Sequence, residues 1–207
     1  INGSNDDQIP IQGVLTSVSS EGFQSSRTNA ISLQKVIVKI PTMNDELATT
    51  FKKDVYRITV RILGLDVKIP LFILFRALGC ISDQEILSNI IYDTDNPHLK
   101  HTLMSLIEPS IKDSDPIYEQ KGAYQFLALH VKGQEIISVI DILRHNLLPT
   151  YKTDVEKYQY IGYAVRKLLL TRGKGLPETD RDSYAMKRID LAGSMLYELY
   201  RELWSIF

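Results

Sequence analysis

The stretch Ile69-Pro70-Leu71-Phe72-Ile73-Leu74-Phe75-Arg76-Ala77-Leu78-Gly79 is a dense apolar block in this 207-residue sequence. Its longest apolar run extends from Ile69 to Phe75 and includes a proline. A helix that crosses a bilayer needs roughly 20 apolar residues, so this block predicts a buried core element rather than a membrane span. The block also separates a strand-like pattern upstream from a helical pattern downstream.

Upstream of the block, apolar and polar residues alternate in the way that half-buried strands require. Residues 36–40 read Val-Ile-Val-Lys-Ile, and Tyr56, Ile58, Val60 and Ile62 alternate with polar residues up to Leu65. The polar residues 43–54 between them predict a long loop. The N-terminal part of the chain therefore predicts a small β-sheet.

Downstream of the block, the sequence carries helix start and stop signals. Ser82–Glu85 and Thr153–Glu156 each have the spacing of a capping box, and Asn96-Pro97 predicts a helix that ends before Pro109. Further helices are expected at about 117–132 and 134–148. A last helix is expected from a stripe of apolar residues at helical spacing: Ile189, Ala192, Leu196, Leu199, Leu203 and Ile206. The fold class is therefore α+β, with a small N-terminal β-sheet followed by a predominantly helical body.

Composition narrows the class of protein without naming a function. Hydrophobic residues make up 44% and charged residues 24%, which is typical of a globular domain and excludes a disordered tail. The net charge is −1, yet residues 144–188 contain ten Lys and Arg and only five Asp and Glu. This excess predicts one basic surface. The single cysteine, Cys80, cannot form an internal disulfide and suits a reducing compartment. Because the chain starts at Ile1, we expect a domain cut from a longer polypeptide.

Motifs that carry chemistry are weak in this sequence. His98 and His101 are spaced for one metal, but no third ligand follows at a recognisable spacing, so we expect no metal site. Gly173-Lys174-Gly175 lacks the other residues of a phosphate loop and predicts a helix end. No known catalytic motif occurs, so no catalytic residue is expected in this chain.

One polar cluster, Asp180-Arg181-Asp182-Ser183-Tyr184-Ala185-Met186-Lys187-Arg188, allows two interpretations. In the first, Asp182 or Ser183 caps the last helix, and Lys187 and Arg188 are ordinary surface charges. In the second, the same helix start faces a nucleic-acid backbone and offers a carboxylate to a base edge.

Several motifs, in order, resemble the lobe of the second-largest subunit of multisubunit DNA-directed RNA polymerases. The cluster and its continuation to Gly193 resemble a signature of that subunit where the lobe rejoins the protrusion. The apolar block resembles the subunit's apolar strand and its Phe-Arg-Ala-Leu-Gly turn. Further matches are Ser26-Arg27, Asp83, Glu85-Ile86-Leu87, Tyr92-Asp93, Asp141-Ile142-Leu143, Leu148-Pro149, Gly162-Tyr163 and Leu168-Leu169-Leu170. The resemblance is colinear from about residue 25 to the C-terminus.

The resemblance implies a linker at 1–24, a lobe domain at 25–183, and a helix at 184–207 that returns toward the protrusion. It implies a non-catalytic part of the DNA cleft wall that guides DNA and docks factors. The parent enzyme, a nucleotidyltransferase, uses magnesium, with zinc elsewhere in the complex, and this fragment alone should hold no cofactor and be inactive. Other polymerase subunits, DNA and initiation factors would be its partners, and no membrane is involved.

For individual residues, the resemblance implies DNA contacts by Asp182, Lys187 and Arg188. The alternative is a diverged module that docks initiation factors without touching DNA. Ala185, Met186 and Ser194 depart from the family pattern, which suggests a diverged lineage such as a large DNA virus. The site of action would be the nucleus for a cellular protein, and the virion or the host cytoplasm or nucleus for a viral one. Arg76 is expected to bond carbonyls or a carboxylate such as Asp83 or Glu85, not DNA.

Overall fold

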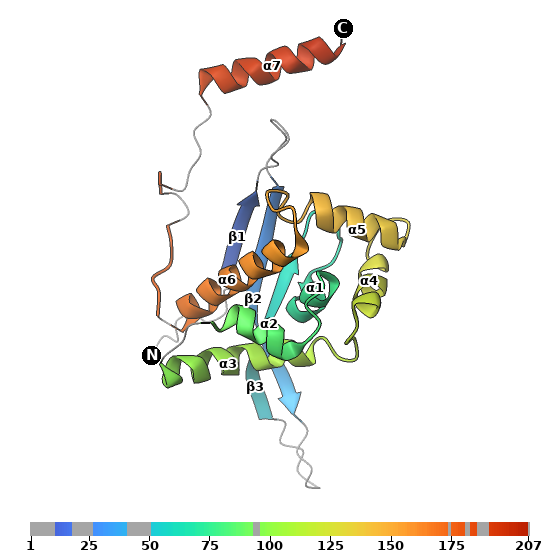
Figure 1. The fold of residues 1–207 in the computed structure, drawn as a ribbon. Helices are drawn as coiled ribbons and strands as arrows, with labels where there is room; N and C mark the ends of the chain where they lie inside the picture. The colour runs from blue at the N-terminus through green and yellow to red at the C-terminus, as the bar shows by residue number, and fades with distance from the viewer. Residues whose placement is uncertain are drawn as a thin grey trace. The chain divides into compact units, whose positions relative to one another are not determined.

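The computed structural model describes residues 11–17, 27–40, 51–92, 96–173, 175–180, 183–185 and 191–206. The chain divides into two units, Ile1–Leu176 and Pro177–Phe207. The first unit holds a sheet and the helices that cover it, and the second holds the C-terminal helix (Figure 1). No helix among the described residues is long and apolar enough to cross a membrane.

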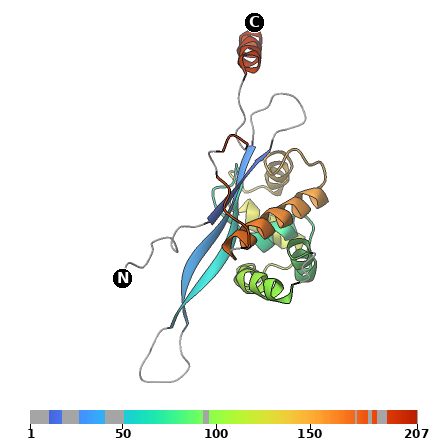
Figure 2. The same ribbon diagram turned by 90° about the vertical axis from the view of Figure 1, so that its left-hand side faces the viewer.

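The sheet has four antiparallel strands in the order β1-β2-β3-β4. They are β1 (Ile11–Ser17), β2 (Arg27–Ile40), β3 (Phe51–Arg61) and β4 (Ile69–Pro70). In the register of β2 and β3, Leu33 lies opposite Ile58 and Ile31 opposite Val60, and all four side chains are buried. The helices of this unit cover that apolar face of the sheet (Figure 2), as an alternating strand pattern requires.

The two predicted strands are confirmed as parts of β2 and β3, but β3 begins earlier than expected and ends at Arg61 rather than near Leu65. Strand β2 contains the whole of residues 36–40, and β3 begins at Phe51, so residues 51–54 are strand and their prediction as loop was wrong. Polar residues there extend β3 because each pairs with a residue of β2, as Lys52 does with Lys39. Cross-strand pairing thus overrides their weak strand propensity.

The apolar block is mostly a helix, which corrects the expectation of a strand. Only Ile69 and Pro70 pair with β3, and α1 (Leu71–Ala77) follows directly. Pro70 precedes the helix as its N-cap residue with a φ of −57°, so it contributes no amide to further pairing. Every residue of α1 is buried, and a helix that is apolar all round shows no period that would distinguish it from a buried strand.

Among the described residues of the first unit, five helices follow α1. They are α2 (Asp83–Ile90), α3 (Pro97–Lys112), α4 (Gln120–Ala128), α5 (Ile136–His145) and α6 (Asp154–Arg172). Their buried side chains form one core with the sheet and α1. The α+β prediction, with the sheet first and helices after it, is confirmed.

Helix α3 continues through Pro109, where it was expected to stop. Its start is as predicted, since the Asn96 side chain accepts a hydrogen bond from the amide of His98 at 3.1 Å. Beyond the proline, Ser110 is buried and its Oγ accepts a hydrogen bond from the Ile58 amide of β3 at 3.0 Å. Packing against the sheet thus holds the last turn despite the hydrogen bond that proline removes.

The two predicted capping boxes behave differently. At α6, Thr153 Oγ1 accepts from the Glu156 amide at 3.3 Å, and Glu156 Oε2 accepts from the Thr153 amide at 3.4 Å. At α2, Ser82 is the N-cap residue but makes no side-chain cap bond, so that box was wrongly predicted. Glu85 instead lies near the buried thiol of Cys80, where burial first and the Glu85 charge second raise the pKa of Cys80 to about 12.

The second unit contains α7 (Ala192–Ile206). Within this helix the rings of Tyr200 and Trp204 stack at 5.9 Å between centroids. None of its residues is buried, and Leu196, Leu199 and Leu203 are all exposed.

Candidate functional site

Asp182, Lys187 and Arg188, the predicted DNA contacts, lie outside the described residues. Near them, the Ser183 amide donates to the Asp180 carbonyl at 3.3 Å, and the Ala185 amide donates to Ser183 Oγ at 3.4 Å. Helix α7 begins only at Ala192, so the prediction that Ser183 caps it was wrong. A serine hydroxyl can bond the amide two residues on in a local turn as well as at a helix start, and here it forms the turn.

Arg76 is a buried cation whose partners lie closer to the surface. Its side chain is 1% exposed, its NH2 donates to Asp83 Oδ1 at 2.5 Å, and its NH1 donates to the carbonyl of Ile117. The guanidinium also lies over the ring of Tyr118, 5.1 Å from the centroid. Arg76 therefore ties α1 to α2 and to the segment before α4, and the prediction that it bonds a carbonyl and a carboxylate is confirmed.

Lys157 of α6 is buried although it belongs to the stretch rich in Lys and Arg at residues 144–188, which we call the basic stretch. It is 1% exposed, and its ammonium donates to the carbonyls of Leu143 at 2.7 Å and Arg144 at 3.1 Å. Those carbonyls belong to the last turn of α5, where a positive charge is favourable. Burial lowers the pKa of Lys157, the Asp154 carboxylate opposes that change, and Arg144 adds to it.

Other cations of the basic stretch are engaged with tyrosines on separate elements. Arg166 lies over the ring of Tyr92 at 4.0 Å and donates to the Tyr92 carbonyl after α2. Arg172 lies over the ring of Tyr56 on β3 at 4.9 Å and donates to its hydroxyl at 2.5 Å. Within the first unit these cations therefore fasten α6 to its neighbours rather than forming one basic patch.

A row of tyrosines continues to a lysine along α6, and we call Tyr151, Tyr160, Tyr163 and Lys167 the tyrosine–lysine strip. Ring centroids are 5.2 Å apart between Tyr151 and Tyr160, and 6.2 Å apart between Tyr160 and Tyr163. The Lys167 ammonium lies 4.8 Å from the centroid of Tyr163. Hydrogen bonding and charge at Tyr163 raise the pKa of Lys167, which keeps this exposed side chain cationic.

Neither this strip nor the burial of Lys157 was predicted from the sequence. Tyr160, Tyr163 and Lys167 follow the i, i+3, i+7 spacing of one helix face, so a search for polar aromatic residues at that spacing could have found the strip. Lys157 lies four residues before Ile161 and eight before Val165, on the buried face of α6, so helical spacing could have predicted its burial. Its partners could not be predicted in this way, because they are backbone carbonyls of another helix.

Gly162 explains how α6 approaches α2 so closely. A Cβ at this position would lie 2.6 Å from the carbonyl oxygen of Asn89, a separation that real Cβ atoms do not show. Only glycine fits here without a shift of the helices, which gives a physical reason for the Gly162-Tyr163 motif.

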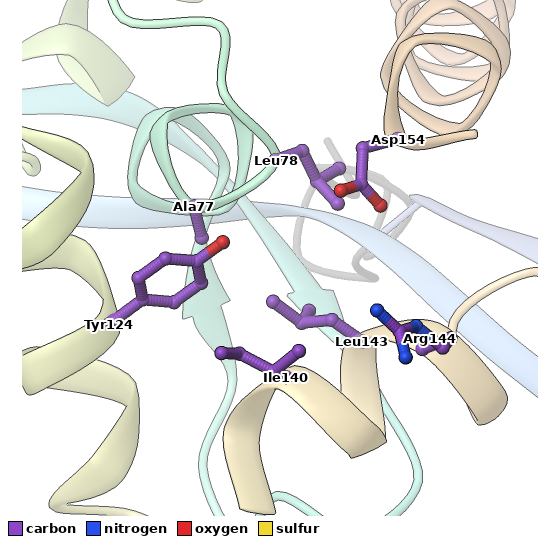
Figure 3. A pocket seen from close by; sticks show the side chains of 7 residues that line it. All are labelled: Ala77, Leu78, Tyr124, Ile140, Leu143, Arg144 and Asp154. Atoms are coloured by element: carbon purple, nitrogen blue, oxygen red, sulfur yellow. The ribbon is translucent and has the colours of Figure 1, made fainter. Parts of the chain in front are cut away.

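A small pocket lies between α1, α4, α5 and the start of α6. Its volume is about 30 Å³, which is room for about one water molecule and far less than a nucleotide needs. Figure 3 shows Tyr124 on one side of it, and Arg144 and Asp154 on the other. Burial first, and then the Asp154 charge, raise the pKa of Tyr124.

Within the part of the chain that the structure describes, no group of three or more His, Cys, Asp or Glu side chains could hold a metal ion. His98 and His101 are both exposed on α3.

Comparison with known proteins gives matches along most of the chain. Residues 16–190 match the family model described as RNA polymerase Rpb2, domain 2. The chain is 33% identical over 161 residues, 72% of its length, to DNA-directed RNA polymerase II subunit RPB2 of Encephalitozoon cuniculi. It is 35% identical over 147 residues to DNA-directed RNA polymerase II subunit 2 of Arabidopsis thaliana, covering 66% of this chain. The matched regions span 13% and 12% of those two relatives.

Proposed function

This chain belongs to the RNA polymerase Rpb2 domain 2 family, the lobe of the second-largest subunit, and from this premise we propose that it is a non-catalytic part of a DNA-directed RNA polymerase. The observation that carries the proposal is the family match over residues 16–190. In the assembled enzyme the lobe forms part of the DNA cleft wall, guides DNA and docks other polypeptides. A cellular version would act in the nucleus.

The chemistry of RNA synthesis belongs to other parts of the complex in this proposal. Magnesium would be held by aspartates of the largest subunit, and zinc would be bound elsewhere. The contribution of this chain is a rigid support, in which Arg76 and Lys157 each tie helices of the first unit together.

For DNA guidance, we propose that Asp182, Lys187 and Arg188 contact DNA. The family match continues through these positions, and Tyr184 beside them is 84% exposed. A carboxylate can read a base edge, whereas a lysine or arginine on a phosphate carries little sequence information and gives salt-dependent binding.

The test uses the assembled polymerase with Asp182→Ser, Lys187→Ala and, as a matched control, Lys132→Ala in the exposed turn before α5. Asp182→Ser should change sequence-dependent pausing or open-complex lifetime, and Lys187→Ala should weaken complexes generally, most at high salt. Lys132→Ala should change neither. If Asp182→Ser lowers the melting temperature but leaves pausing and lifetime unchanged, Asp182 has a structural role and the DNA contact is wrong.

The second candidate function is docking of initiation factors without DNA contact. One observation favours it: Lys157, Arg166 and Arg172 are engaged with three different elements of the first unit. Such cations are poorly placed to act together on a nucleic-acid backbone. Unchanged salt dependence of DNA complexes in both Lys187→Ala and Arg188→Ala would favour docking over DNA guidance.

A further inference from the structure

We propose that the tyrosine–lysine strip of α6 is a docking surface for an acidic segment of a partner protein. This inference rests on the proposed docking role and names the surface and the chemistry of its partner. The strip combines aromatic rings with a positioned cation, and Tyr is among the residues that contribute most to the energetics of many protein interfaces.

The geometry of the strip suits a rigid binding surface. Tyr151 and Tyr160 are half-buried, and their contact at 5.2 Å limits ring motion. Tyr163 is 40% exposed, and Lys167 is exposed beside it. The Thr153–Glu156 capping box secures the start of the helix. A partner therefore meets side chains that are already ordered, which reduces the entropy lost on binding.

Charge complementarity points to an acidic partner. From Lys157 to Pro177 the sequence contains five Lys and Arg and no Asp or Glu. Lys157 is buried, so Lys167 is the exposed cation of the strip itself. Acids are also present at the start of α6, where Glu156 is held in the capping box. The acidic segment should therefore lie toward Lys167 and the C-terminal half of the helix.

The contact between Lys167 and Tyr163 reduces the ring area that is open to a nucleic-acid base. The Lys167 ammonium lies over one face of the Tyr163 ring at 4.8 Å, so a base could stack only on the other face. A carboxylate can reach that ammonium without displacing it from the ring. The tyrosine hydroxyls add hydrogen-bond donors to the same carboxylates.

The test measures fluorescence anisotropy of the 207-residue chain with two labelled probes. One is an oligoglutamate peptide with a central Leu-Leu pair, and the other is oligo(dT) of matched length and charge. The variants are Tyr163→Leu, Lys167→Gln, Lys167→Glu and Lys167→Arg, with Lys132→Glu as the matched control. Thermal melting of each variant establishes that it is folded, as expected for exposed positions.

The peptide should bind the unsubstituted chain. Lys167→Gln should weaken that binding about threefold, Lys167→Glu more strongly, and Tyr163→Leu measurably. Lys167→Arg should retain binding, and Lys132→Glu should leave it unchanged. Absence of peptide binding, or an equal loss in Lys132→Glu, overturns the proposal. Tighter binding of oligo(dT) with the same sensitivity to Tyr163 and Lys167 also overturns it, in favour of a nucleic-acid surface.

Assembly into the polymerase is measured in parallel to separate this inference from the proposed function. If the chain assembles within its parent subunit but does not bind the peptide, only the docking surface is wrong. If the parent subunit carrying the unsubstituted chain fails to join the polymerase, the proposed function itself is contradicted.

Discussion

Arg76 and Lys157 are both buried to 1% exposure, yet they are stabilised by different chemistry. Arg76 has a carboxylate partner, the half-exposed Asp83, together with a carbonyl and an aromatic ring. The Lys157 ammonium instead donates to carbonyls at the end of a helix. The first arrangement tolerates a permanent charge, whereas the second leaves a charge whose burial is only partly compensated.

Replacing Arg76 by Ala should lower the free energy of unfolding by about 1–3 kcal/mol, because the partly buried Ile117 carbonyl loses its donor. Asp83→Asn should cost less, since Asp83 is partly exposed and retains water. Urea denaturation of both variants measures the difference. Equal melting temperatures for Arg76→Ala and the unsubstituted chain would contradict the role assigned to Arg76.

Lys157 should make stability depend on pH in a defined direction. Burial lowers the pKa of Lys157 below 10.5, the ordinary value for a lysine, so just below pH 10.5 the unfolded state binds more protons than the folded state. The free energy of unfolding contributed by Lys157 therefore rises with pH in that window. We subtract the free energy of unfolding of Lys157→Met from that of the unsubstituted chain. The result should be more positive at about pH 10 than at about pH 7.

The matched control for this measurement is Lys132→Met, at an exposed lysine. Other titrating groups contribute equally to the unsubstituted chain and to the variant, so their contributions cancel. The free energy of unfolding of the unsubstituted chain minus that of Lys132→Met should therefore not change with pH. A difference for Lys157→Met that stays constant or shrinks toward pH 10 would show that the folded state does not disfavour the charged amine.

At the scale of elements, local signals predicted where helices begin better than where they end. Asn96 and Thr153 start α3 and α6 as expected because their side chains bond amides a few residues away. Pro109 failed as a stop because contact with a strand distant in sequence holds the last turn of α3. The helical state of α1 was also hidden, since its burial on every side comes from elements that the local pattern does not contain.

The two boxes at Ser82 and Thr153 provide a direct comparison of cap chemistry. Thr153→Ala removes a formed cap bond and should lower stability by about 1 kcal/mol. Ser82→Ala removes no cap bond and should change stability by less than about 0.5 kcal/mol. Chemical denaturation of both variants measures this difference, and an equal loss in both would show that the Thr153 bond contributes nothing.

At the scale of the whole molecule, the order of sheet and helices could be predicted because hydrophobic period and cap residues are local properties. The start of α7 could not be predicted, because serine occurs both in local turns and at helix starts. Here the Ser183 hydroxyl accepts a hydrogen bond within a turn, and α7 begins only at Ala192. The tyrosine–lysine strip depends on ring contacts between Tyr151, before α6, and Tyr160 within it. No motif in the sequence encodes that contact.

The isolated 207-residue chain should incorporate no nucleotides on a DNA template in the presence of magnesium. The reason is that the proposed catalytic aspartates belong to another subunit of the enzyme. A primer-extension assay with labelled nucleotides, run beside an assembled polymerase as positive control, measures this. Templated RNA synthesis by the pure chain would overturn the whole functional assignment.

The link between Ser17 and Thr150 has a consequence for synthesis on the ribosome. Their hydroxyls lie 2.7 Å apart across a sequence separation of 133 residues, so the end of β1 finds this partner only after α5 has been made. At ordinary translation rates the delay is on the order of ten seconds. During that time β1 can pair with β2 but lacks the contacts that α6 makes with it, so that side of the sheet is not yet covered. The nascent chain is therefore most in need of chaperone protection before α6 emerges from the exit tunnel.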